Sequence, residues 1–117
     1  MTPTVLIVDD DADFRRLARR MLSSSGVEVI SEAASVGSAR AAAIELRPDA
    51  ALVDVCLPDG NGIELARELA ELDWSPRIVL TSTDAGIAGD DVDRGIVFVA
   101  KADLPTAPLL KLMETRS

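Results

Sequence analysis

The sequence predicts an α/β protein built on a doubly wound, parallel, five-stranded sheet. Short apolar runs rich in valine, leucine and isoleucine alternate with one-sided helical patterns along the chain, which is typical of strand–helix units. Four of the apolar runs also stop abruptly at polar residues, as buried parallel strands do at their carboxyl ends. The residues that end these runs are Asp9-Asp10-Asp11, Asp54, Thr81-Ser82 and Lys101.

The first half of the chain is expected to contain two strand–helix units. A strand over 5–8 precedes a helix that Asp11 or Asp13 can cap, in which apolar residues recur at i, i+3, i+4, i+7 and i+8. The apolar positions are Phe14, Leu17, Ala18, Met21 and Leu22, and Arg15, Arg16, Arg19 and Arg20 fill the opposite, solvated face. A strand over 27–33 and an alanine-rich helix over 34–46 form the second unit.

The second half of the chain continues the alternation. The expected elements are a strand over 50–53, a loop over 57–62, a helix over 63–72, a strand over 78–80, a strand over 96–100 and a helix ending near Thr115. Glycines and aspartates dominate 84–95, which leaves room for only a shortened fourth helix. Parallel strands joined by right-handed crossovers fit the order 2-1-3-4-5, in which the first and third strands are neighbours.

Length and composition restrict the class of protein. The 117 residues suit a single domain over 1–117, and 48% hydrophobic with 27% charged residues is typical of a soluble globular protein. The net charge of −8 disfavours direct binding of nucleic acid, which needs lysines and arginines against phosphates. The absence of histidine excludes histidine metal ligands and catalytic triads within the chain.

The expected location is cytoplasmic, without membrane contact. No basic and apolar leader opens the chain, and no apolar run is long enough to span a bilayer. Cys56 is the sole cysteine, so it cannot form an internal disulfide and indicates a reducing compartment. We expect Cys56 to be a small residue that is buried or half-buried.

Three acids are expected to meet at one edge of the sheet, because the carboxyl ends of neighbouring parallel strands converge there. Asp9, Asp10 and Asp54 would repel one another, at about 4 kcal/mol for a pair 4 Å apart at an effective dielectric of about 20. Mg²⁺ removes that repulsion and prefers oxygen ligands. Lys101 adds an ammonium and Thr81 a hydroxyl at the same edge, and this set suits a phosphoryl group during transfer to a carboxylate.

Five motifs, in order and at matching spacing, resemble those of response-regulator receiver domains of two-component signalling. They are the acidic run in 5–11, the segment 52–62 with Asp54 followed by a proline and two glycines, the segment 78–82 ending in Thr81-Ser82, Phe98, and Lys101. The resemblance extends from about Thr4 to Met113. It implies a flavodoxin-like (βα)5 fold, like that of chemotaxis regulators, and a signalling switch controlled by phosphorylation.

The resemblance also implies a role for each acid. Asp54 would accept a phosphoryl group from the phosphohistidine of a histidine kinase or phosphotransfer domain. Asp10 and Asp54 would bind Mg²⁺, or Mn²⁺, directly. Asp9 would act through a water molecule, and the backbone carbonyl of Cys56 would be a further ligand.

The implied switch uses three more residues. Lys101 would pair with a phosphoryl oxygen, and Thr81 would move to hydrogen-bond it, opening space into which Phe98 turns. The surface of the fourth and fifth units would then change. Such a protein is a regulator that assists its own phosphorylation and dephosphorylation rather than an enzyme. Its output would be a downstream protein or a further domain beyond residue 117.

Two features depart from the receiver pattern. Ala102 follows Lys101, where receivers commonly have a proline in a cis peptide, and a cis bond before alanine would cost about 2.5–4 kcal/mol. A trans bond and an altered placement of the lysine are therefore expected. The span from Thr81 to Lys101 is also shorter than usual, which affects the expected output surface more than the phosphorylation site.

Other functions remain open from the residues alone. One is a receiver-shaped protein-interaction module that does not use phosphorylation. Another is a haloacid-dehalogenase-type phosphatase with Asp9 as nucleophile, although Lys101 then falls on the wrong side of Asp90-Asp91 and Asp54 has no role. A flavodoxin is disfavoured, because the acids after the first strand would repel the cofactor phosphate. The basic stripe on the first helix could dock a kinase's phosphohistidine domain. The sequence names no kinase, signal or oligomeric state.

Overall fold

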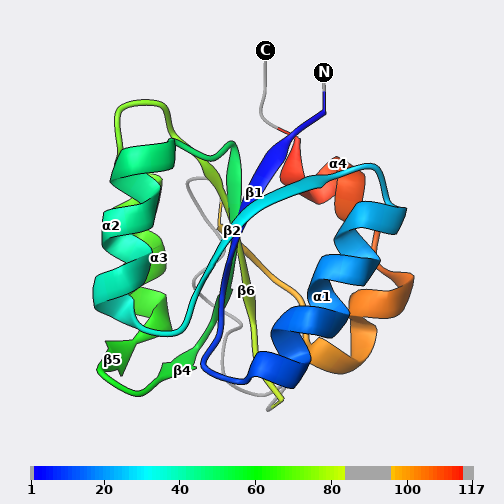
Figure 1. Cartoon of the computed structure of the whole chain (residues 1–117), viewed down its shortest axis with the longest axis horizontal. Coiled ribbons are helices and arrows are strands. Elements are labelled where there is room, and N and C mark those ends of the chain that lie inside the picture. Colours follow the sequence, from blue (N-terminus) through cyan, green and yellow to red (C-terminus); the bar gives the residue numbers. More distant parts are fainter. Residues whose placement is uncertain (1, 84–95, 115–117) are drawn as a thin grey trace.

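The computed structural model describes residues 2–83 and 96–114 and has three layers, a parallel sheet between two layers of helices (Figure 1). The strands of the sheet are β1 (Thr4–Val8), β2 (Glu28–Ala33), β3 (Ala50–Asp54), β6 (Arg77–Thr81) and β7 (Ile96–Phe98). Their order is β2-β1-β3-β6-β7, and every pair is parallel. The predicted fold class and strand order are confirmed, and β1 and β3 are neighbours.

Helices cover both faces of the sheet, as Figure 1 shows. One face carries α1 (Ala12–Ser24), the 3₁₀ helix η1 (Lys101–Thr106) and α4 (Leu109–Met113), and the other carries α2 (Val36–Leu46) and α3 (Gly62–Ala70). The predicted shortened fourth helix, in 84–95, lies outside the described residues. None of the helices in the described part has the length and apolar character to cross a membrane.

The core is aliphatic and is divided by the sheet into two clusters. Leu6 and Val8 of β1 pack with residues of α2 and α3, whereas Val5 and Ile7 pack with residues of α1, η1 and α4. This alternation follows from the two-residue period of a strand. All four side chains are at most 1% exposed, and burying each one fully stabilises the fold by about 1.5–3 kcal/mol. Both faces of β1 are therefore covered, which holds its carboxyl end in place.

The first helix follows the predicted pattern with one exception. Asp11 is its N-cap, with a side chain that accepts hydrogen bonds from the backbone of Asp13 at 2.9 Å and Phe14 at 3.3 Å. Ala18 and Leu22 are buried as predicted. Leu17 is 49% exposed, so its assignment to the buried stripe was wrong. The neighbouring residues Phe14 and Ala18 contact the sheet-side core instead.

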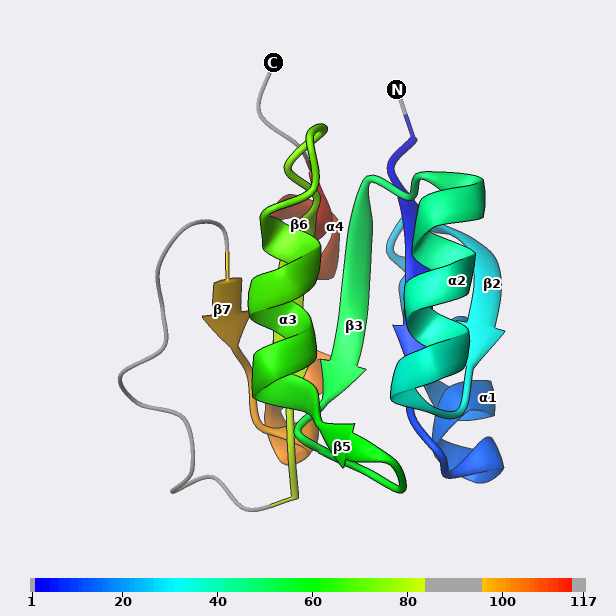
Figure 2. The same cartoon turned by 90° about the vertical axis from the view of Figure 1, so that its left-hand side faces the viewer.

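Residues 57–62 are not the irregular loop that the sequence predicts. Short strands β4 (Cys56–Leu57) and β5 (Gly60–Asn61) pair antiparallel, and Figure 2 shows this hairpin beside the ends of α2 and α3. Asp59 at the hairpin tip accepts hydrogen bonds from the backbone of Val36 at 2.7 Å and Gly37 at 3.1 Å. Those two bonds lower the pKa of Asp59. The hairpin is thus attached to the start of α2, a long-range contact that local sequence does not encode.

Candidate functional site

The predicted acids lie together at the carboxyl edge of the sheet. Asp9 directly follows β1, and Asp54 is the last residue of β3. Asp9 is 1% exposed and Asp54 is 8% exposed, whereas Asp10 is exposed to solvent. One carboxylate oxygen of each residue lies within 4.8 Å of the others. The arrangement is three hard oxygen donors converging on one point, which suits a divalent cation such as Mg²⁺.

Each buried acid has one oxygen held by the backbone. Asp9 Oδ1 accepts from the amide of Asp11 at 2.9 Å, and Asp54 Oδ1 accepts from the amide of Cys56 at 3.3 Å. The second oxygens of both carboxylates point to the ammonium of Lys101, at 2.9 Å for Asp9 and 3.5 Å for Asp54. The backbone therefore orients the two carboxylates, and the lysine bridges them.

Lys101 reaches the site although alanine follows it. No peptide bond is cis among residues 2–83 and 96–114, so Lys101–Ala102 is trans as expected. The amide of Lys101 donates to the carbonyl of Ser82 at 3.0 Å, which continues the pairing of β7 with β6. Its ammonium also lies 4.1 Å from the centroid of the Phe14 ring. The expected displacement of the lysine therefore does not remove it from the acids.

The charges of this cluster do not balance. Burial, followed by the charge of Asp9, raises the pKa of Asp54, and the Lys101 charge offsets only part of that increase. Burial opposes the charge of Lys101, but its hydrogen bond to Asp9 and the charges of Asp9 and Asp54 raise its pKa overall. Three carboxylates lie together while one ammonium bridges two of them, so the carboxylates outnumber this ammonium when all are ionised. A bound divalent cation would neutralise that excess.

Thr81 offers a buried hydroxyl beside this cluster. It is the last residue of β6 and lies opposite Asp54 in the β3–β6 register, so their side chains share one face of the sheet. The residue is 1% exposed, and within the described residues its Oγ1 has no hydrogen-bond partner. An unpaired buried hydroxyl costs about 1–3 kcal/mol. An anionic ligand bound at Asp54 would provide the missing partner.

Cys56 and Phe98 occupy the surroundings of the site. The thiol of Cys56 is exposed, so the expectation of a buried or half-buried side chain was wrong. The reason is that Cys56 begins the hairpin, which leaves the sheet. Phe98 is half-buried on β7 and packs against the core on the α2–α3 side. It pairs with Leu80, the residue before Thr81.

Two residues near the acids have no predicted role within this cluster. Phe14, interpreted only as a core position, contacts the ammonium of Lys101. Arg15, interpreted as part of a solvated face, is 19% exposed at its side chain and donates from Nη1 to the carbonyl of Asp9 at 2.6 Å. The sequence signal for both is their position within the first helical turn after the acids, where side chains can reach back to the site.

Comparisons with known proteins agree with this geometry. The family model described as the response regulator receiver domain matches residues 5–101. The chemotaxis protein CheY of Thermotoga maritima is 34% identical over 82 residues, covering 70% of this chain and 68% of that protein. The transcriptional activator DevR/DosR of Mycobacterium tuberculosis is 47% identical over 66 residues, covering 56% of this chain but only 30% of DevR/DosR.

A solved structure shows the same fold over almost the whole chain. The CheY-like receiver domain from Methylobacillus flagellatus superposes with a TM-score of 0.83 at 23% identity, covering 97% of this chain and all of that one. The strand order, the position of the acids and the family match lead to one conclusion. This chain belongs to the response regulator receiver domain family.

Proposed function

We propose that the chain is a signalling switch in which Asp54 accepts a phosphoryl group with Mg²⁺ bound beside it. The observation that carries the proposal is the cluster of Asp9, Asp10 and Asp54 within 4.8 Å, two of them bridged by Lys101. Asp10 and Asp54 would contact the cation directly, Asp9 would act through water, and the carbonyl of Cys56 would be a further ligand. Mg²⁺, or Mn²⁺, would supply positive charge to the carboxylates and to the phosphoryl oxygens.

The proposed transfer uses a phosphohistidine of a histidine kinase or phosphotransfer domain as donor. A carboxylate oxygen of Asp54 forms a bond to phosphorus while the phosphorus–nitrogen bond breaks, and the imidazole nitrogen keeps the electron pair. The product is an aspartyl phosphate. Lys101 holds one phosphoryl oxygen through its ammonium, and water later attacks phosphorus to release inorganic phosphate. The chain thus acts as a regulator that takes part in its own modification.

The proposed output begins at Thr81. Its hydroxyl, which has no partner in the described residues, would donate to a phosphoryl oxygen on Asp54. A movement of Thr81 would alter the packing of Leu80 and of Phe98 on the neighbouring strand. The changed surface around β6 and β7 would be the signal to a downstream protein or to an output domain elsewhere in the same polypeptide.

Phosphorylation by acetyl phosphate, followed by intact mass, tests the proposal. With millimolar Mg²⁺ the wild-type chain should gain one phosphoryl group, and beryllofluoride should shift amide resonances around Thr81. Asp54→Asn should abolish both responses. Hydrolysis of a small phosphate ester that survives Asp54→Asn but is lost in Asp9→Asn would overturn the proposal in favour of a phosphatase. No response to either reagent would favour an interaction module.

A further inference from the structure

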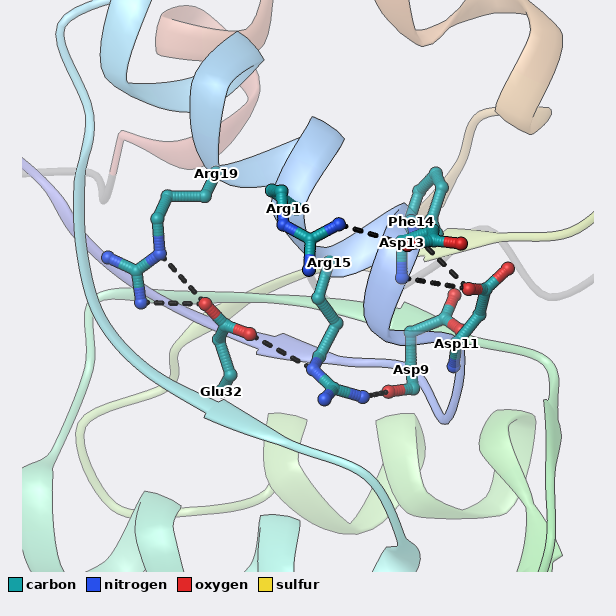
Figure 3. Close-up of polar contacts among 8 residues, drawn as sticks. All are labelled: Asp9, Asp11, Asp13, Phe14, Arg15, Arg16, Arg19 and Glu32. Atoms are coloured by element: carbon teal, nitrogen blue, oxygen red, sulfur yellow. Dashed lines mark hydrogen bonds and ion pairs between the residues drawn. The ribbon is translucent and has the colours of Figure 1, made fainter.

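Arg15 lies closer to the acidic cluster than its place in a basic stripe suggests. Its guanidinium donates from Nη1 to the carbonyl oxygen of Asp9 at 2.6 Å and from Nε to Glu32 Oε1 at 2.9 Å (Figure 3). The other carboxylate oxygen of Glu32 accepts from Nε of Arg19 at 2.8 Å. Glu32 belongs to β2, so the network joins α1, β2 and the connection that follows β1.

Ion pairs between Glu32 and the two arginines stabilise this network. Burial alone would raise the pKa of Glu32, but hydrogen bonds and charges from Arg19 and Arg15 lower it overall, so its carboxylate stays ionised. The side chains of Arg15 and Glu32 are 19% and 28% exposed, whereas that of Arg19 is 46% exposed. Glu32 therefore fixes the guanidinium of Arg15 in a partly enclosed position from which it reaches Asp9.

The hydrogen bond from Arg15 to the carbonyl of Asp9 affects the orientation of the next residue, Asp10. This carbonyl belongs to the planar peptide unit that joins Asp9 to Asp10, so fixing the oxygen fixes the plane of that unit and the direction in which Asp10 leaves it. Asp9 is independently held through its side chain, by the amide of Asp11 and the ammonium of Lys101. Asp10 is exposed, and among the described contacts its carboxylate has no such support.

We propose that Arg15 is a positioning residue for the cation site, because it holds the Asp9–Asp10 peptide in the orientation that brings Asp10 toward Asp9 and Asp54. This inference rests on the proposed function, since it concerns the same Mg²⁺ site. Arg15 would not be a ligand of the cation, and its positive charge close to the acids would oppose cation binding. Geometry and charge therefore predict opposite effects when the residue is removed.

Calorimetric titration with Mg²⁺ distinguishes the two effects. Arg15→Met should weaken Mg²⁺ binding about tenfold, in the range found for residues that orient metal ligands. Arg19→Met is the matched control, because Arg19 is also an arginine that pairs with Glu32, but it makes no hydrogen bond to Asp9. The Mg²⁺ affinity of this variant should differ from that of the wild type by no more than about twofold. Arg15→Lys keeps the charge but cannot bridge two acceptors in the same way, so it should also bind Mg²⁺ more weakly.

Two further readouts separate positioning from general instability. In metal-free protein, the amide nitrogen resonance of Asp10 should shift in Arg15→Met and not in Arg19→Met. The rate of phosphorylation by acetyl phosphate should require more Mg²⁺ in Arg15→Met and should return close to the wild-type rate at saturating Mg²⁺.

Wild-type or tighter Mg²⁺ binding by both Arg15 variants would overturn the inference while leaving the proposed function intact. If Arg15→Met does not fold, Arg15→Lys carries the same test. Failure of the wild-type chain to bind Mg²⁺ or to be phosphorylated would instead overturn the proposed function, and the role of Arg15 with it.

Discussion

Asp49 and Asp54 lie at opposite ends of the same strand, β3, and have different surroundings. At the amino-terminal edge of the sheet, Asp49 Oδ2 accepts from the amide of Thr4 at 2.9 Å and from its hydroxyl at 3.2 Å. The amide of Asp49 donates to the same hydroxyl at 3.0 Å, and its carbonyl accepts from the amide of Arg77 at 2.9 Å. One aspartate thus joins the starts of β1, β3 and β6.

The carboxyl-terminal edge leaves comparable groups incompletely paired. Asp54 faces Asp9 across the ammonium of Lys101, and burial together with the charge of Asp9 raises its pKa. The hydroxyl of Thr81 has no partner within the described residues. The hydrogen bonds of Asp49 satisfy its own polar groups internally and stabilise the fold, whereas the excess negative charge and the unpaired hydroxyl beside Asp54 suit a ligand.

The largest expected effect comes from Gly62, which begins α3 against the backbone of Asp54 and Val55. A Cβ at this position would lie 1.9 Å from the carbonyl oxygen of Asp54 and 2.9 Å from Cα of Val55. Because these are backbone atoms that cannot move cheaply, Gly62→Ala should lower the free energy of unfolding by about 3 kcal/mol or more. Urea unfolding followed by circular dichroism measures this.

Gly37 provides the matched control for that substitution. A Cβ there would meet only Asp59 Oδ2 at 3.7 Å, an ordinary contact, in the first turn of α2. Gly37→Ala should be neutral or stabilise the protein by up to about 1 kcal/mol, since alanine favours a helix more than glycine does. Equal stabilities for the two variants would contradict the close approach of α3 to Asp54.

The next largest effect concerns Asp49 at the amino-terminal edge. Asp49→Ala removes the acceptor of both Thr4 hydrogen bonds and leaves a partly buried amide unpaired, so the free energy of unfolding should fall by about 2 kcal/mol. Asp49→Asn keeps one oxygen acceptor and should lose less than half as much. Fluorescence of Trp74, whose Nε1 donates to the carbonyl of Pro48 at 2.8 Å, reports unfolding at this edge. An Asp49→Ala protein as stable as wild type would show that the edge is not held by these bonds.

At the other end of β3, replacing the aspartate should stabilise the protein instead of destabilising it. In metal-free protein, Asp54→Asn should raise the free energy of unfolding by about 1 kcal/mol, because it removes a buried carboxylate from the charge of Asp9. The pKa of Asp54 is higher in the folded state, so the folded protein binds the extra proton and wild-type stability falls as pH rises. The difference between wild type and Asp54→Asn should therefore grow upward from about pH 4, the pKa region of an unfolded aspartate, until the folded-state pKa is passed.

Saturating Mg²⁺ should remove this difference, because a cation bound only by the folded wild type restores its stability. Unfolding at several pH values, with a chelator and with Mg²⁺, measures both effects. A destabilised Asp54→Asn protein in the chelator would mean that Lys101 compensates the carboxylates completely.

Local patterns in the sequence were sufficient to predict the sheet and which acids and lysine lie together at its edge. Apolar runs define the five strands, and the polar residues that end them lie at one edge because parallel strands impose it. Two of the errors concern contacts between distant segments. The β4–β5 hairpin is held by Asp59 against α2, more than twenty residues earlier in the chain. Arg15 was interpreted as solvated because its partners, Glu32 and the Asp9 carbonyl, are brought together only by the pairing of β1 with β2.

The sequence predicts Lys101 at this edge of the sheet, but its particular contacts could not be predicted, for a similar reason. Its amide is held by Ser82 and its ammonium by Asp9, contacts that depend on the pairing of β6 with β7 and on the position of α1. The sequence does indicate that a trans bond to Ala102 is favoured, because the alternative is costly for a residue other than proline. It does not indicate that a phenylalanine from α1 would lie against the lysine.

The smallest expected effect concerns Phe14. At each end of the sheet, a cationic side chain lies over an aromatic ring. The Lys101 ammonium lies 4.1 Å from the Phe14 ring centroid, and the Arg47 guanidinium lies 4.2 Å from that of Trp74. The side chain of Lys101 is 16% exposed and that of Arg47 is 57% exposed. Water screens the exposed pair of Arg47 and Trp74 more than the pair of Lys101 and Phe14. A double-mutant cycle of Phe14→Leu with Lys101→Met should therefore give the larger coupling, about 0.5–1 kcal/mol.

The corresponding cycle of Trp74→Leu with Arg47→Met should give a smaller coupling, and 0.5 M NaCl should reduce it further, since the Debye length at that concentration is only about 4 Å. Urea unfolding of the single and double variants measures both cycles. Additive effects of Phe14→Leu and Lys101→Met would contradict a positioning contact between them, and the lysine would then be held by its two carboxylates alone. A coupling larger than that of Arg47 with Trp74 would instead show that the aromatic ring helps hold the only cation that bridges the buried acids in the described structure.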